Sequence, residues 1–178
     1  CLLTSEKSNR IKNLAREFVL QEKLDGYPRG MVRHLVIRED PRSGNMILNL
    51  ITSNSGEFPF ERFCRAMEEL TQGVVWSINH SPADRSYGEI RQIFGNDHLF
   101  QTLAGLRFQV PVQSFFQTNS EQAENLLRVI GEFAGLSGTE VILDLYSGTG
   151  SIGLSLAKRS RSVLGIEEDK AASALSEE

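Results

Sequence analysis

The sequence is poor in the residues that build disulfide frameworks and metal clusters. It has two cysteines, Cys1 and Cys64, far apart along the chain, and three histidines without metal-ligand spacing. Such a set excludes a disulfide-stapled scaffold and carries no zinc signature. No apolar run approaches the roughly eighteen residues of a membrane span, and no signal peptide heads the chain. We therefore expect a cytoplasmic protein with no membrane partner.

An excess of positive charge is also missing. The 19 lysines and arginines are outnumbered by 23 aspartates and glutamates, which leaves a formal net charge of −4 at pH 7. Bulk electrostatics therefore gives no support for nucleic-acid binding, and such a partner would need a local patch or segments outside this chain. Arg33, Arg38 and Arg42 could touch phosphates, but arginines on a solvated strand face are the commoner explanation.

The most informative stretch runs from Val141 to Glu168. An apolar run at its start predicts a parallel strand buried on both faces, and residues 162–166 predict a second strand. Between them, apolar residues at 152–157 predict a helix that begins just after two glycines. The stretch is therefore interpreted as one strand–helix–strand unit.

The turn of this unit has features of a ligand-binding site. Gly148 and Gly150 let the backbone approach a bound molecule closely, and the start of the helix presents unpaired N–H groups. Glu167, at the end of the second strand, can accept hydrogen bonds from both hydroxyls of a ribose. We expect this unit to bind a molecule that contains adenosine.

Two kinds of adenosine-containing ligand fit the glycines. Residues 148–153 match the G-x-G-x-x-G of dinucleotide sites, so an NAD-dependent oxidoreductase is one alternative. Asp144 and Tyr146 favour S-adenosylmethionine over a dinucleotide. Together with the glycines they form D-x-Y-x-G-x-G, which resembles the first motif of S-adenosylmethionine-dependent methyltransferases, with tyrosine replacing its first glycine. A phosphate-binding P-loop is not indicated, because no Gly-Lys-Ser/Thr follows the glycines.

The residues before Val141 are predicted to form both helices and strands. Helical spacing predicts a helix capped by Ser5 or Ser8, a second over residues 58–71, and a third from Asn119 or Ser120 to Ala134. The third helix is predicted to bury five residues, which are Ala123, Leu126, Leu127, Ile130 and Phe133. Strands are predicted at residues 32–39, 46–52, 73–79, 87–94, 100–103 and 106–110. This order predicts an α+β central domain over residues 1–112, then the incomplete start of an α/β domain over residues 113–178. The resemblance of its first motif implies that this second domain is a Rossmann-like methyltransferase domain.

A longer pattern identifies a family. Gly105 to Asn119, which ends in Ser-Phe-Phe-Gln-Thr-Asn, and Leu143 to Gly150 together resemble the RNA (uracil-5-)-methyltransferases. This family uses S-adenosylmethionine to methylate C5 of uridines in tRNA or rRNA. The strands around residues 32–38 and 77–79 also resemble its central domain, so the likeness spans nearly the whole chain.

The resemblance implies a set of cofactor-binding residues. They are Gln117, Tyr146, Ser151 and Glu167, and the glycine turn adds Gly148 and Gly150 to the expected site. Gln117 would bind the methionine end, and Tyr146 would cover the cofactor. From the residues themselves, Phe115 and Phe116 could stack a base, but we expect them to anchor the loop that presents Gln117. Ser147 replaces the cysteine usual in the family, and Ser151 replaces the asparagine of several members. Asp144 is expected to orient the glycine turn through hydrogen bonds.

The family's reaction also implies what this chain lacks. C5 of uracil is a poor nucleophile, so members add a cysteine thiolate to C6 and later remove the C5 proton with a base. That cysteine lies beyond the strand–helix–strand unit, so we expect this chain to be an inactive internal piece of a longer enzyme. Cys64 falls on an apolar helical stripe, as an inert cysteine does. An RNA-binding domain and an iron–sulfur cluster would lie only outside this chain, and a non-catalytic RNA-binding module is a further alternative.

Overall fold

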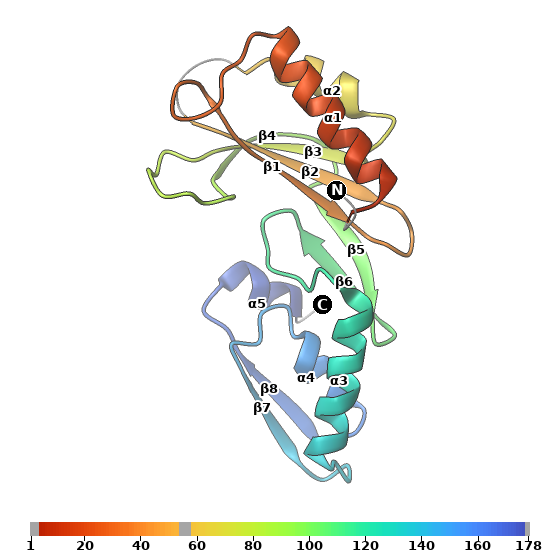
Figure 1. The fold of residues 1–178 in the computed structure, drawn as a ribbon. Coiled ribbons are helices and arrows are strands. Elements are labelled where there is room, and N and C mark those ends of the chain that lie inside the picture. The colour runs from red at the N-terminus through yellow and green to blue at the C-terminus, as the bar shows by residue number, and fades with distance from the viewer. Residues whose placement is uncertain (1–3, 54–57, 177–178) are drawn as a thin grey trace. The chain divides into compact units, whose positions relative to one another are not determined.

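The computed structural model of the chain describes residues 4–53 and 58–176. They form two compact units, one of residues 1–99 and 111–113, the other of residues 100–110 and 114–178. The chain therefore passes into the second unit, back into the first, and again into the second (Figure 1). The domain boundary predicted after residue 112 stays a prediction.

The first unit is a four-stranded sheet with two helices on one face (Figure 1). Its elements are α1 (Glu6–Gln21), β1 (Val32–Glu39), β2 (Met46–Thr52), α2 (Phe60–Met67), β3 (Gly73–Ile78) and β4 (Glu89–Gly95). The strand order is β1-β2-β3-β4, with β2 and β3 parallel and the outer pairs antiparallel. A parallel pair needs a crossover, which α2 supplies between β2 and β3. The predicted bounds of β1 and β2 match the structure.

An aromatic-rich core joins the helices of this unit to the sheet. Phe18 of α1 meets Phe63 of α2 edge-on, with ring centroids 5.3 Å apart, and Phe60 stacks on Trp76 of β3 at 5.9 Å. Phe63 is fully buried, and burial of a side chain of this size contributes about 1.5–3 kcal/mol to stability. Ser5 caps α1 by accepting the Ser8 N–H at 3.0 Å. Of the two predicted caps, Ser5 is therefore the correct one.

The opposite face of the sheet combines a small apolar cluster with a polar chain. Ile47 and Val75 pack against Leu99 and Val112. Beside them, Ser77 Oγ donates to Asn49 Oδ1 at 2.7 Å and accepts from Gln113 Nε2 at 2.9 Å. This chain of hydrogen bonds fixes the residue that precedes the Ser114–Asn119 loop.

The second unit contains the predicted strand–helix–strand unit. It contains residues 100–103 of β5 (His98–Leu103) and residues 106–110 of β6 (Leu106–Pro111). Its other elements are α3 (Ser120–Ala134), β7 (Val141–Leu145), α4 (Ser151–Ala157), β8 (Ser162–Ile166) and α5 (Lys170–Ser176). β5 and β6 form a hairpin, and β7 and β8 pair in parallel with Asp144 opposite Gly165. A core of hairpin and α3 side chains includes Leu103, Phe108, Val110 and Leu127.

Two predictions about burial in this unit are wrong. β7 was expected to be buried on both faces, but Val141, Leu143 and Leu145 are each more than half exposed. The reason is that α4 packs on β7 and β8, and within residues 4–53 and 58–176 no comparable helix covers the other face. On α3, Leu126 and Phe133 are also largely exposed, because the buried stripe runs through Ala123, Leu127 and Gly131 at intervals of four residues.

Among the described residues, no helix is both long enough and apolar enough to cross a membrane.

Candidate cofactor-binding site

The turn between β7 and α4 has a backbone that most residues avoid. Tyr146, Gly148 and Gly150 all have positive φ, at 58°, 56° and 77°. Glycine adopts this left-handed region freely, whereas a tyrosine is strained there. Tyr146 therefore has the conformation that a glycine would provide at this position of the methyltransferase motif. Its side chain is 88% exposed, so packing of the ring does not explain the strain.

Asp144 and Gly153 join the helix to the strand below the turn. Asp144 Oδ2 accepts the Gly153 N–H at 2.8 Å in a buried position. A Cβ atom on Gly153 would lie 2.8 Å from Val163 Cγ1 and 3.0 Å from that carboxylate oxygen. The third glycine of the motif is therefore required for close packing of α4 on the strands. The hydrogen bond of Asp144 thus reaches α4, and its expected role in orienting the glycine turn stays a prediction.

Glu167 follows β8 and faces the same turn. Its Oε2 accepts the Gly148 N–H at 2.7 Å, and its Oε1 accepts the Asp169 N–H at 2.8 Å. These backbone donors, first that of Asp169 and then that of Gly148, lower the pKa of the Glu167 carboxyl. The carboxylate is thus charged and held in place at neutral pH. Each of its oxygens can accept a further hydrogen bond.

The loop before α3 supplies the other side of the site. Phe116 is 5% exposed and packs on Phe108, with ring centroids 5.6 Å apart. Phe115, its neighbour, is 80% exposed. Only Phe116 therefore anchors the loop, and the expectation that both rings do so is wrong for Phe115. Asn119 ends the loop by accepting the Gln122 N–H at 3.0 Å, which caps α3.

These segments enclose a pocket of about 280 Å³, close to the lower end of the roughly 300–1,000 Å³ typical of ligand sites. Eleven residues of the second unit line it, namely Ser114, Phe115, Phe116, Gln117, Tyr146, Gly148, Thr149, Ser151, Glu167, Asp169 and Ala172. Segments that are about thirty residues apart in sequence thus contribute to one cavity.

Five of the six predicted site residues line this pocket. They are Gln117, Tyr146, Gly148, Ser151 and Glu167. The sixth, Gly150, is the N-cap residue of α4 and contributes through its backbone conformation. Sequence reasoning missed Thr149, Asp169 and Ala172 as lining residues. Thr149 lies between two predicted glycines and could have been found from that position, whereas Asp169 and Ala172 carry no signal in the sequence.

Cys64 is unsuited to nucleophilic chemistry. It is 2% exposed in the core of the first unit, and burial, followed by the nearby charge of Glu61, raises the pKa of its thiol to about 11. The thiolate that attacks carbon electrophiles is therefore scarce at neutral pH. Cys1 lies outside the described residues. Within residues 4–53 and 58–176, no group of three His, Cys, Asp or Glu side chains is arranged to hold a metal ion.

Sequence comparison finds relatives among the RNA methyltransferases. Over 94% of its length, the chain is 35% identical to an uncharacterized RNA methyltransferase of Bacteroides thetaiotaomicron, of which it covers 39%. Over 95% of its length, it is 32% identical to the tRNA (uracil(54)-C(5))-methyltransferase of Pyrococcus furiosus, of which it covers 40%. The chain thus spans about two fifths of the length of these relatives. No protein-family model matches it.

Structural comparison also finds an RNA methyltransferase. The crystal structure of Pyrococcus abyssi tRNA (uracil-54, C5)-methyltransferase in complex with S-adenosyl-L-homocysteine matches with a TM-score of 0.76 and 32% sequence identity. The match covers 93% of this chain and 41% of that protein. The chain therefore has a mixed α/β, methyltransferase-like fold.

Proposed function

Because this chain belongs to the same family as the RNA methyltransferases that it matches over 94% of its length, we propose that the whole protein methylates C5 of a uridine in RNA with S-adenosylmethionine. The relatives named for uracil 54 of tRNA favour tRNA over rRNA as the substrate. A cytoplasmic location is part of this proposal.

The observation that carries the proposal is the pocket in which Gln117, Tyr146 and Glu167 meet. Glu167 offers a fixed, charged acceptor for the two hydroxyls of a ribose. The Gln117 amide can both donate to and accept from the amino-acid end of the cofactor. Tyr146 and Phe115, both largely exposed, offer aromatic faces to a flat ring.

We also infer that β7, α4 and β8 begin a Rossmann-like sheet. The parallel pairing of β7 with β8 and the glycine turn at the carboxyl end of β7 support this inference. In such sheets, ligands bind beyond the carboxyl ends of the strands. Tyr146 follows β7 and Glu167 follows β8, so both residues lie at that edge.

The chemistry assigns limited tasks to this chain. S-adenosylmethionine, when bound, supplies an electrophilic methyl group. The residues described above would bind and orient it, while a thiolate must add to C6 of uracil and a base must remove the C5 proton. Cys64 does not meet the first demand, because it is buried and protonated. We propose that a part of the whole protein outside this chain supplies the nucleophile and the base.

The comparisons do not favour the oxidoreductase alternative, but one experiment separates the two ligands directly. S-adenosylmethionine and NADH would be titrated separately into the full-length protein by calorimetry. We expect S-adenosylmethionine alone to bind, and Glu167→Ala to weaken that binding at least tenfold. Glu168→Ala is the matched control, because it removes a neighbouring exposed carboxylate of the same charge. Binding of NADH, or equal effects of the two variants, would contradict the proposed site.

The substrate is tested by methyl transfer. The full-length protein would be incubated with radiolabelled S-adenosylmethionine and either unmodified tRNA or unmodified rRNA, followed by digestion to nucleosides. We expect label in 5-methyluridine from tRNA. Label from rRNA alone would retain the enzyme class and change the substrate, whereas no label in either RNA would contradict the proposed reaction.

A further inference from the structure

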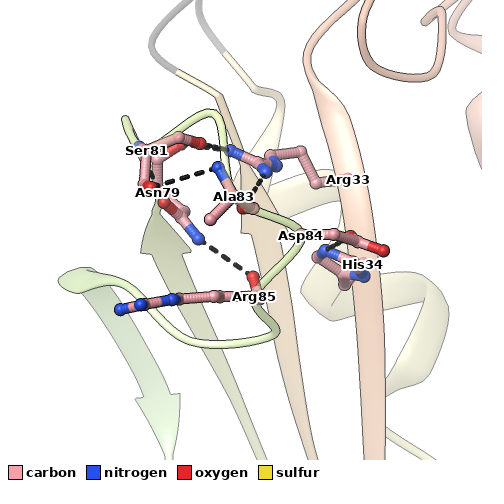
Figure 2. Close-up of polar contacts among 7 residues, drawn as sticks. All are labelled: Arg33, His34, Asn79, Ser81, Ala83, Asp84 and Arg85. Atoms are coloured by element: carbon pink, nitrogen blue, oxygen red, sulfur yellow. Dashed lines mark hydrogen bonds and ion pairs between the residues drawn. The ribbon is translucent and has the colours of Figure 1, made fainter.

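The connection between β3 and β4, residues 79–88, has a fixed backbone although most of its side chains are exposed. Arg33 of β1 forms hydrogen bonds with this connection (Figure 2). Its Nη1 donates to the carbonyl oxygens of Asn79 at 2.9 Å and Ser81 at 2.6 Å, and its Nη2 donates to that of Ala83 at 2.7 Å. One guanidinium group thus binds three backbone carbonyl oxygens within residues 79–83.

Further contacts hold this connection, which we call the Arg33 loop, at both ends. The buried Asn79 accepts the Ser81 N–H at 2.8 Å and donates to the Arg85 carbonyl oxygen at 2.9 Å (Figure 2). Gln113 clamps Gly88, accepting its N–H at 3.1 Å and donating to its carbonyl oxygen at 3.0 Å. His34 Nε2 lies 3.0 Å from Asp84 Oδ1. The loop is therefore ordered by polar contacts with the sheet rather than by a core of its own.

What the ordered loop presents is a pair of side chains suited to unstacked bases. Arg85 Nη1 donates to the Tyr87 hydroxyl at 2.7 Å, and its guanidinium carbon lies 5.7 Å from the centre of the tyrosine ring. Tyr87 is 50% exposed. A second pair is formed by Tyr27 and Arg33, whose guanidinium carbon lies 4.4 Å from that ring. Arginine planes and aromatic rings are the surfaces on which single-stranded RNA bases stack.

We propose that the Arg33 loop is an RNA-contact surface, in which Arg85 and Tyr87 bind unstacked nucleotides of the substrate. The proposal rests on the proposed function, since it assumes an RNA substrate, but it concerns a surface of the first unit that contains no residue of the cofactor pocket. Arg33 is a positioning residue, because its guanidinium is directed to the loop carbonyls.

The test measures RNA affinity of the full-length protein by fluorescence anisotropy. The probes are a fluorescein-labelled unmodified tRNA transcript and a labelled 20-nucleotide oligouridylate. We expect Arg85→Ala combined with Tyr87→Ala to weaken binding of both probes roughly tenfold or more. Because the variant removes one positive charge from the RNA-contact surface, log affinity should also depend less steeply on log salt. Arg16→Ala, at an exposed position on α1, is the charge-matched control.

A second variant tests the positioning role. Arg33→Lys keeps the positive charge but loses the fork that reaches three carbonyl oxygens. We expect weaker RNA binding together with faster amide hydrogen exchange at residues 80–87, and an unchanged affinity for S-adenosylmethionine. Faster exchange without loss of RNA binding would overturn the positioning role.

The two proposals fail in different ways. If the wild-type protein methylates RNA and the Arg85 and Tyr87 double variant binds both probes as tightly as wild type, the RNA-contact surface is wrong and the enzyme class stands. If the wild-type protein binds neither RNA probe nor S-adenosylmethionine, the proposed function is wrong as well. An equal loss of RNA binding in Arg16→Ala would also overturn the surface, because the effect would then be general electrostatics.

Discussion

At the scale of single residues, Phe115 and Phe116 show how adjacent identical side chains take opposite roles. The sequence places two aromatics before Gln117 and does not distinguish them. Both rings line the pocket, but the structure buries Phe116 against Phe108 and leaves Phe115 largely exposed. One ring therefore stabilises the loop, and the other is available to a ligand.

This difference predicts opposite phenotypes for two alanine variants. Phe116→Ala should lower the free energy of unfolding by about 3–5 kcal/mol, as for other buried phenylalanines. Phe115→Ala should change it by less than about 1 kcal/mol while weakening S-adenosylmethionine binding. Urea denaturation and calorimetry measure the two effects. Equal destabilisation by both variants would show that Phe115 is buried in solution.

Gly153 allows a second prediction at the residue scale. Gly153→Ala places a methyl group 2.8 Å from Val163 Cγ1, so α4 must shift from the strands at a cost of about 1–3 kcal/mol. Gly131→Ala is the matched control, because that glycine also lies in a helix but its added Cβ meets the flexible end of Arg159 at 3.0 Å. There we expect a change below about 1 kcal/mol, since alanine favours the helix. Thermal denaturation that ranks the control as the worse variant would refute this packing argument.

At the scale of elements, a hydrogen-bonded turn precedes β7. Glu140 Oε2 accepts the N–H groups of Ser137, Gly138 and Thr139 at 2.9–3.1 Å, and its Oε1 accepts the Ser137 hydroxyl. The Ser137 side chain is the largest cause of the lowered pKa of Glu140, which is about 2 instead of 4.5. The turn that starts the strand–helix–strand unit therefore depends on a charged carboxylate.

A pH dependence follows with a definite sign. Because the folded-state pKa of Glu140 is depressed, its contribution to stability is complete above about pH 4.5 and is lost as the pH falls toward 2. Glu140→Gln should remove that part of the acid dependence, whereas Glu68→Gln, at an exposed position, should retain it. Urea denaturation between pH 2 and 6 provides the measurement. Parallel stability curves for wild type and Glu140→Gln would rule this role out.

At the scale of the whole molecule, one face of the β7–β8 pair is apolar and exposed. Val141, Leu143, Leu145, Leu164 and Ile166 are each more than half exposed. Contiguous apolar surface of this kind drives association when water is its only partner. A strand pair also has open hydrogen-bonding edges.

We therefore expect the 178-residue chain, prepared by itself, to self-associate. Sedimentation velocity at increasing concentration should show growing oligomers, and Leu143→Ser combined with Leu164→Ser should shift them toward monomer. Leu20→Ser is the control, because Leu20 is an exposed leucine on α1 of the other unit. A chain that stays monomeric throughout would show that this face is covered in solution.

The local pattern of the sequence was sufficient to locate most helices and strands. Strand-forming and turn residues located β1 and β2 to the residue, and the glycine spacing located the turn between β7 and α4. These features depend on neighbours within a few positions, which a sequence displays directly. The site residues were chosen mainly through the family resemblance, and five of the six line one pocket.

What only the tertiary structure decided depends on contacts between distant segments. Helical periodicity placed Leu126 and Phe133 on the inner face of α3, but the stripe that meets other elements contains neither. The sequence likewise could not show that Arg33 is directed to carbonyl oxygens more than forty residues away. Periodicity defines which residues share a face, whereas burial depends on which other elements pack against that face, and only the folded chain brings those elements together.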